Sequence, residues 1–304
     1  MRSDEELPAE QLALSERCEA LLASDKWNRA HTVTHAGLLE RLQMIVDAGL
    51  PPMRLLSAKK LEELGRIPRS DEGHQEDAVA VVKRYGVDDS NKPKATLFFY
   101  SHRWSRPNWC EVMQLEAAWG SAERTAAEAE GEQFGDPDDA THAKAKALVQ
   151  YARWFKHNMN KGGSGAFGWW AGISNEIDEV FYWVDYACAD QTAPGPDMAA
   201  LPAYVAVCAT LVLASWTDAY AARAWCRVEL LMSYAFVTTG DQVLVLPEGF
   251  VDEEHWAVDK REDTLLDPAE GLLTNPSDKA VIASLRGVAE RSTAFSCWRP
   301  GASA

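Results

Sequence analysis

The alternation of apolar and polar positions divides this chain of 304 residues into helical and strand-like segments. Over residues 1–90, apolar residues recur at helical spacing in several runs, two of which stop at Gly49 and Gly86. This pattern predicts an N-terminal helical region. After Lys94 the spacing changes to a short, continuously apolar run, ATLFFYSH, which predicts a first strand.

Three further apolar runs, EVFYWVDYA, CATLVLAS and DQVLVLPEGF, predict three more strands, each separated from the previous one by a helical segment. Continuously apolar strands alternating with helices are typical of a parallel sheet that is covered on both faces. The sequence therefore predicts an α/β fold. We expect a helical region over 1–90, an α/β domain over 95–250 with an insertion at about 120–170 that expands the first helical segment, and a C-terminal helical extension or cap over 251–304.

One acidic residue, Glu229, interrupts the apolar stripe of the predicted helix YAARAWCRVELLMSYAF. At about 100° per residue, Glu229 lies about 40° around the helix from Trp225, with Phe236 at about 20° and Met232 at about 340°. A carboxylate in such a stripe must be paired, protonated or directed into a cleft, because an isolated buried charge is too costly. The structural alternative is a glutamate that is hydrogen-bonded to a neighbouring strand or paired with Arg223 or Arg227.

Polar residues follow each predicted strand, at the edge where open parallel sheets bind their ligands. The residues are Ser101, His102, Arg103 and Trp104 after the first strand, Asp185 after the second, and Ser215 and Trp216 after the third. Glu229 belongs to the helix that starts from the third strand end. The sequence therefore predicts that these side chains share one site.

Three of these segments, SHRW, WVDY and above all SWTDAYAARAWCRVEL, resemble the TIR (Toll/interleukin-1 receptor) superfamily, over roughly residues 95–250. The resemblance implies a flavodoxin-like parallel sheet flanked by helices. Some TIR domains hydrolyse or cyclise NAD with the glutamate of this motif, which corresponds to Glu229. The chain departs from the family pattern at Arg223, where a serine is usual, and in its expanded first helical segment.

The resemblance and the strand ends together give a candidate site for NAD, which would be the substrate of the protein and not a bound cofactor. Glu229 would be the catalytic carboxylate. The candidate substrate-binding residues are Ser101, His102, Arg103, Trp104, Asp185, Ser215, Trp216, Tyr220 and Trp225. Arg103 and Arg106 precede a predicted helix and are placed to contact the pyrophosphate. Residues 189–198 correspond to the family's BB loop, which takes part in substrate access and in assembly between domains.

Composition excludes some classes of partner and indicates the cellular compartment of the protein. A net charge of −16 argues against nucleic-acid binding. His31 and His35 have a spacing suited to a metal, but no third ligand is near them in the sequence, so no metal site is expected. Six cysteines without CxxC pairs indicate a reducing compartment. No run is apolar over the roughly 18 residues of a membrane span, so we expect a soluble, cytoplasmic protein.

Two other functions fit the same residues. The chain would be an interaction or scaffold protein if its TIR-like domain only self-associates, and Glu229 would then be structural. It would be similar to nucleoside deoxyribosyltransferases, which also use one glutamate, if it acts on free nucleosides. A serine or cysteine nucleophile is disfavoured, because Ser101 lacks a GxSxG elbow and Cys226 has no neighbouring histidine in the sequence.

Overall fold

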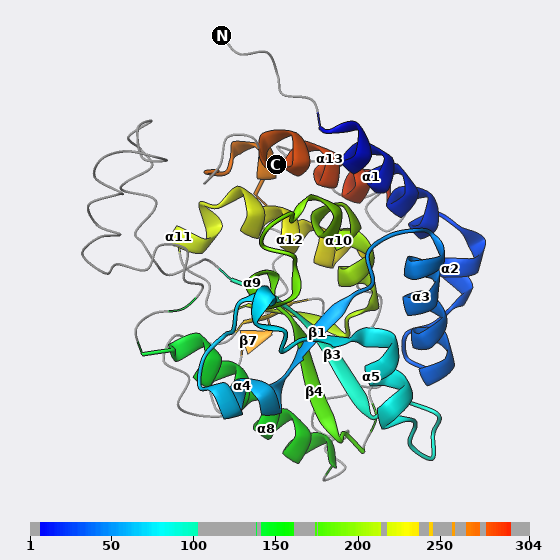
Figure 1. Ribbon diagram of the computed structural model, residues 1–304, viewed down its shortest axis with the longest axis vertical. Helices are drawn as coiled ribbons and strands as arrows, with labels where there is room; N and C mark the ends of the chain where they lie inside the picture. The colour runs from blue at the N-terminus through cyan, green and yellow to red at the C-terminus, as the bar shows by residue number, and fades with distance from the viewer. Residues whose placement is uncertain are drawn as a thin grey trace, which may run out of the picture.

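The fold is seen in a computed structural model, which describes residues 7–102, 138, 141–160, 174, 176–213, 218–236, 243–245, 257–258, 266–273 and 278–292. Within these ranges the strands form one seven-stranded sheet in the order β2-β1-β4-β3-β5-β6-β7. Helices pack around this sheet (Figure 1). The predicted α/β class, with a sheet flanked by helices, is confirmed. No helix in the described ranges is both long enough and apolar enough to cross a membrane.

The described N-terminal residues form mostly helices, and they also contribute two strands to the sheet. The helices are α1 (Ala9–Leu22), α2 (Asp25–Arg29), α3 (His35–Asp47), α4 (Ala58–Leu64) and α5 (Ala78–Tyr85). Between them lie β1 (Arg54–Ser57) and β2 (Glu76–Asp77), which the sequence did not predict. Because β1 pairs with β4, the N-terminal region is joined to the α/β sheet by backbone hydrogen bonds.

Side-chain caps explain where several of these helices begin. The Thr34 hydroxyl accepts a hydrogen bond from the backbone N–H of Gly37 at the start of α3 (3.1 Å). Ser57 caps α4 and Asp77 caps α5 in the same way, at 3.0 Å and 2.8 Å. Each cap satisfies an N–H group that has no partner within its helix. Helix α4 ends at Gly65, whose φ of +67° suits a residue without a Cβ.

The four predicted strands form the parallel centre of the sheet. They are β3 (Ala95–Ser101), β4 (Glu179–Trp183), β5 (Thr210–Leu213) and β6 (Val243–Val245). Each pairs in parallel with its neighbour in the order β4-β3-β5-β6. At one edge β1 is antiparallel to β4, and at the other β7 (Ala257–Val258) is antiparallel to β6. The parallel centre therefore agrees with the prediction, and the antiparallel edges are additions to it.

The remaining elements differ from the predicted ones mainly at their ends. They are α8 (Ala143–Asn160), α9 (Asp185–Cys188), α10 (Gly195–Val207), α11 (Asp218–Ala221), α12 (Ala224–Phe236), α13 (Asp278–Arg291) and two 3₁₀ turns, Ser70–Glu72 and Pro268–Glu270. The prediction that the second strand reaches Asp185 is wrong, because β4 stops at Trp183 and Asp185 starts α9. Helix α8 lies in the predicted insertion, of which the structure describes residues 138 and 141–160.

The single helix predicted after β5 is in fact two helices, α11 and α12. The break is stabilised by a backbone contact with the segment 266–273, in which Leu272 donates to Ala222 O (2.7 Å) and accepts from Ala224 N (3.0 Å). The neighbouring Gly271 lies so close that a Cβ there would be 2.4 Å from the Ala224 Cα. The C-terminal segment therefore fixes the start of α12, the helix that carries Glu229.

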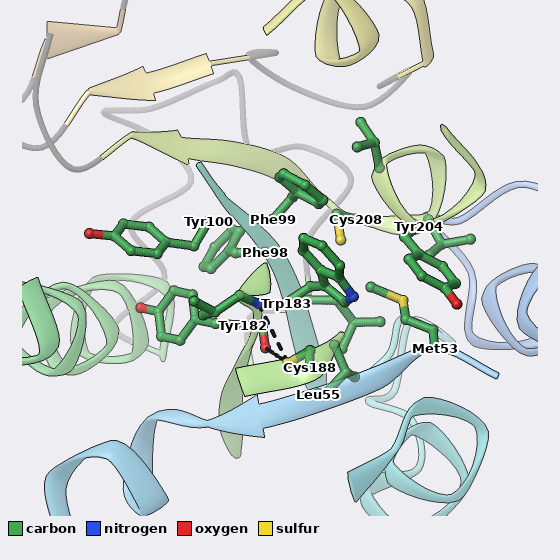
Figure 2. Packing of buried hydrophobic residues seen from close by; sticks show 14 of the residues in the cluster. Met53, Leu55, Phe98, Phe99, Tyr100, Tyr182, Trp183, Cys188, Tyr204 and Cys208 are labelled. Carbon is green, nitrogen blue, oxygen red and sulfur yellow. Dashed lines mark hydrogen bonds between the residues drawn. The ribbon is translucent and has the colours of Figure 1, made fainter. Parts of the chain in front are cut away.

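Alternate residues of β3 point to opposite faces of the sheet, and each face has its own aromatic core (Figure 2). On one face Phe98 packs against Tyr151 and Phe155 of α8, with ring centroids 5.4 Å and 5.0 Å apart. On the other, Phe99 stacks on Trp183 at 4.7 Å, and Trp183 contacts Tyr204 of α10 at 5.9 Å. The two packed faces fix the position of the β3 carboxyl end, which carries Ser101 and His102.

Candidate functional site

The side chains of Ser101, Tyr220 and Glu229 meet at the carboxyl end of β3. Ser101 is the last residue of this strand, Tyr220 lies in α11 and Glu229 in α12. The Ser101 hydroxyl donates a hydrogen bond to Glu229 Oε2, and its Oγ lies 2.6 Å from the Tyr220 hydroxyl. All three side chains are buried, with Glu229 only 7% exposed. The fold therefore brings together three of the predicted site residues.

Glu229 is a buried acid whose hydrogen bond comes from a neutral hydroxyl. Burial is the largest cause that raises the pKa of Glu229 well above its ordinary value, and the charge of Asp185 adds to it. The hydrogen bond from Ser101 lowers the pKa in part. Of the two arginines considered as partners, Arg227 donates to the backbone carbonyls of Ala221 and Asp267, at 2.6 Å and 2.8 Å. The site thus favours the protonated form of this carboxyl group.

The contacts around Glu229 form a chain that can hold either protonation state. Glu229 is hydrogen-bonded to Ser101, and Ser101 to Tyr220. The Tyr220 hydroxyl donates to the backbone carbonyl of Cys226 (3.3 Å), where this chain of hydrogen bonds ends. When Glu229 is ionised, the Ser101 hydroxyl donates to it. When Glu229 is protonated, its O–H can donate to Ser101, Ser101 to Tyr220, and Tyr220 to the carbonyl. Every hydroxyl proton remains bonded in both states, so a change of charge requires no rearrangement of the core.

A second group of polar side chains lies on the α8 face of the same strand end. His102 stacks on Tyr100, with ring centroids 5.0 Å apart and planes 14° from parallel. Its Nε2 lies 3.1 Å from Asp185 Oδ1, and its Nδ1 lies 3.5 Å from Lys144 Nζ. Lys144 is held at the start of α8, where Asp138 accepts hydrogen bonds from the backbone N–H groups of Lys144 and Ala145.

The segment that follows β4 is held in place by the N-terminal region. Asp197 pairs with Arg54 of β1 (3.3 Å), and the backbone N–H of Gln191 donates to the Ser70 hydroxyl (3.2 Å). The Gln191 side chain donates to the backbone carbonyl of Asp185 (2.9 Å). The N-terminal region therefore supports the part of the site that contains Asp185, which the sequence did not indicate.

The remaining predicted site residues fall into two groups. Arg103, Trp104, Ser215 and Trp216, together with Arg106, lie outside the described residues. Trp225 is described but is directed toward α13, where its Nε1 donates to Asp278 Oδ2 (2.7 Å). A difference of about 40° around the helix is enough to separate Trp225 from Glu229, so these two residues of one apolar stripe contact different neighbours.

Lys144 and Cys226 are site residues that the sequence pattern did not select. The Cys226 thiol approaches the backbone carbonyl of His102 (3.9 Å), and burial raises its pKa well above the ordinary value. Its position next to Trp225, in the predicted helix that also carries Glu229, was a usable signal. Lys144 carried no signal of this kind, because it lies in a Lys- and Ala-rich helix where a lysine is ordinarily solvent-exposed.

A hollow in the described part of the chain lies at the opposite end of the sheet, away from these residues. It is lined by Thr32, Leu38, Ala95, Thr96 and Val207 among others, beside the first residues of β3. None of the residues that line it is ionisable. The hollow therefore offers no acid–base group, whereas the described residues at the carboxyl end of β3 bring Glu229, Asp185 and His102 close to one another. Comparisons of the chain with protein-family models, with characterised proteins and with solved structures find no match.

Proposed function

We propose that this protein cleaves the bond between nicotinamide and ribose in NAD, as a glycohydrolase or cyclase with a TIR-like domain. The observation that carries the proposal is the burial of Glu229 at the carboxyl end of β3, where its hydrogen bond comes from a neutral serine. A buried acid with a strongly shifted pKa is destabilising for a fold. Such groups are common in active sites, where the shift serves the chemistry.

The order of the parallel strands supports the resemblance on which this proposal draws. In the sheet the parallel strands lie side by side in the order β4-β3-β5-β6. If β3 is counted as the first parallel strand along the chain, this order is second, first, third, fourth. This is the order of flavodoxin-like sheets, which bind ligands at the carboxyl ends beside the first strand. Ser101 lies at that end of β3. The TIR-like assignment otherwise rests on the sequence motif around Glu229.

The reaction needs a negative group next to the reacting sugar. As the bond from the anomeric carbon to the pyridinium nitrogen breaks, nicotinamide leaves as a neutral molecule and positive charge develops on the ribose. The Glu229 carboxylate would stabilise this charge more strongly in a buried site than in water. Attack by water forms the new C–O bond and releases one proton, which the carboxylate can accept. In a cyclase, a nitrogen of the adenine ring attacks in place of water.

The proposal is tested by incubating the purified protein at high concentration with NAD and measuring released nicotinamide by chromatography. We expect wild type to release nicotinamide and Glu229→Gln to be slower by about a thousandfold, the scale seen when a main electrostatic group is removed from an active site. Glu290→Gln is the matched control, since Glu290 is exposed and pairs with Arg286 of its own helix. Equal rates for wild type and Glu229→Gln would instead favour a self-associating interaction protein.

The Ser101→Ala variant is expected to change the pH dependence of this activity. The hydrogen bond from Ser101 lowers the pKa of Glu229, so its removal raises that pKa further. Because the ionised carboxylate is the active form, the acid limb of the rate profile should move to higher pH. At neutral pH the rate should fall about tenfold or more, since a hydrogen bond to a charged group contributes about 1.5–3 kcal/mol. A profile identical to that of wild type would contradict the role of Ser101.

The high pKa of Glu229 also favours a second candidate, an enzyme that acts on free nucleosides. A departing purine or pyrimidine must take up a proton, which a protonated Glu229 could donate. Nicotinamide needs no such proton. Nucleoside hydrolysis or base exchange, with no release of nicotinamide from NAD and with a rate that falls as pH rises, would favour this candidate.

The compartment and the assembly of the protein are part of the same proposal. The cysteines of the described ranges, Cys18, Cys188, Cys208 and Cys226, are buried free thiols, which suits the reducing cytoplasm. We propose that the TIR-like domain also self-associates, and that activity therefore rises with protein concentration. A specific activity that is constant over a hundredfold range of concentration would contradict this second statement without affecting the first.

A further inference from the structure

The carboxylate of Asp185 lies at the solvent-facing side of the candidate site and is supported by a buried imidazole. Its Oδ1 accepts hydrogen bonds from the backbone N–H of Tyr186 (2.6 Å) and from His102 Nε2 (3.1 Å). The Asp185 side chain is 30% exposed, whereas that of His102 is 1% exposed. A molecule that binds at the strand ends can therefore reach the carboxylate, while the histidine below it is shielded.

Lys144 determines which nitrogen of His102 carries the proton. Lys144 Nζ lies 3.5 Å from His102 Nδ1, and an ammonium group can only donate hydrogen bonds. Nδ1 must then be the acceptor, so the proton of the neutral imidazole is on Nε2 and is donated to Asp185. The stack on Tyr100 restrains the plane of the ring. Three contacts thus hold the imidazole in one tautomer and one orientation.

We propose that Lys144 and His102 are positioning residues, which hold Asp185 as the acceptor for the two hydroxyl groups of the substrate's ribose. The inference rests on the proposed function, because it assigns a role in recognising the same substrate. A carboxylate at a strand end is a known way of binding ribose hydroxyls in α/β folds. An ionised carboxylate accepts hydrogen bonds and donates none, so it selects hydroxyl groups and repels phosphates.

The charge of Asp185 also acts on the reacting end of the site. The charge of Asp185 contributes to the raised pKa of Glu229 on α12. It also contributes to the raised pKa of Cys226 on the same helix. His102 from β3 and Lys144 from α8 face Asp185 from the other side. A carboxylate that binds the ribose would therefore also add negative potential where the sugar becomes positively charged.

Binding measurements in the Glu229→Gln background separate this role from catalysis. We would measure, by calorimetry, the Kd for NAD and for an analogue whose nicotinamide ribose lacks both hydroxyls. Adding Asp185→Asn should raise the Kd for NAD about tenfold or more, the effect of losing a hydrogen bond to a charged acceptor. The Kd for the analogue should change little. Glu176→Gln, in the exposed segment that precedes β4 and thus far from Asp185, is the matched control and should change neither.

The role of Lys144 is tested by two replacements in the same background. Lys144→Met removes the donor to His102 and should raise the Kd for NAD about fivefold, the scale of one ordinary hydrogen bond. Lys144→Arg keeps a donor and should restore most of the affinity. A merely structural lysine would change the affinity for NAD and for the analogue equally, and both replacements would lower the melting temperature together.

Each outcome decides one statement. Selective loss of NAD binding, with rescue by Lys144→Arg, supports the inference. Equal losses for NAD and the analogue overturn it and leave the proposed function standing, provided that the wild type releases nicotinamide. If wild type neither binds NAD nor releases nicotinamide, the proposed function is overturned, and the inference with it.

Discussion

Replacing Glu229 by glutamine is expected to stabilise the protein at neutral and alkaline pH, although the same change should slow NAD cleavage about a thousandfold. Glutamine has nearly the volume of glutamate and can still hydrogen-bond with Ser101, but it carries no charge to bury. The pKa of Glu229 is raised well above its ordinary value in the folded state, chiefly by burial. Ionising Glu229 in folded wild type therefore costs free energy, and the variant has no such cost.

The sign of the pH dependence follows from this shift. Below the ordinary glutamate pKa of about 4.3, the side chain is protonated in both the folded and the unfolded chain. As pH rises above that value, the unfolded chain ionises first, so the free energy of unfolding of wild type falls until pH passes the raised folded pKa. Stability from this group is thus largest at low pH. The variant does not titrate, so its advantage should be absent near pH 4 and should grow toward pH 8.

Urea unfolding of wild type and Glu229→Gln from pH 4 to pH 8.5 measures this difference. We expect an advantage of about 1 kcal/mol or more for the variant at pH 8, since each pKa unit corresponds to about 1.4 kcal/mol. Glu290→Gln, the exposed control, should show only a small difference, since exposed ion pairs contribute about 0–1 kcal/mol. A Glu229→Gln variant that is less stable than wild type at every pH would show that the carboxylate is structural, and would favour the scaffold alternative.

Much of this site was predictable because its residues follow local rules. Ser101 and His102 come directly after an apolar strand, where open sheets bind ligands. Helical phase by itself places Glu229 in an apolar stripe. Asp185 was identified for the same reason as Ser101, even though β4 ends two residues earlier than predicted. Local sequence patterns therefore identified Glu229 and Asp185, the acids of the site, and the strand β3 whose carboxyl end carries Ser101 and His102.

The parts that could not be predicted depend on contacts between distant segments. Lys144 reaches His102 only because α8 packs on the same face of the sheet as Phe98, a contact that helical spacing cannot reveal. Strand β1 is a run of only four residues, and the pairing with β4 makes it a strand. Helix phase likewise could not decide between the sheet and α13 as the neighbour of Trp225. Tertiary packing overrides local preference in such cases.

Trp183 is a large, fully buried core residue, and its two replacements should differ widely in stability. It is fully buried between Phe99 and Tyr204, directly before the segment that carries Asp185 (Figure 2). Trp183→Ala would leave a cavity and lose the stack, at a cost of about 3–5 kcal/mol in the free energy of unfolding. The strand end would also lose a support, so the affinity for NAD should fall in any protein that remains folded.

Trp183→Phe should lower the free energy of unfolding by much less than its loss of side-chain volume suggests. The indole Nε1 of Trp183 is buried and has no hydrogen-bond partner in the part of the chain that the structure describes. An unsatisfied buried donor costs about 1–3 kcal/mol, and phenylalanine removes that donor while it keeps a ring against Phe99. We therefore expect a net cost below about 1.5 kcal/mol by urea unfolding, because the two effects oppose each other. The half-buried Trp154 is the matched control, and its replacement by phenylalanine should change stability little. A Trp183→Phe variant as unstable as Trp183→Ala would show that the indole N–H has a partner that stabilises this face of the sheet.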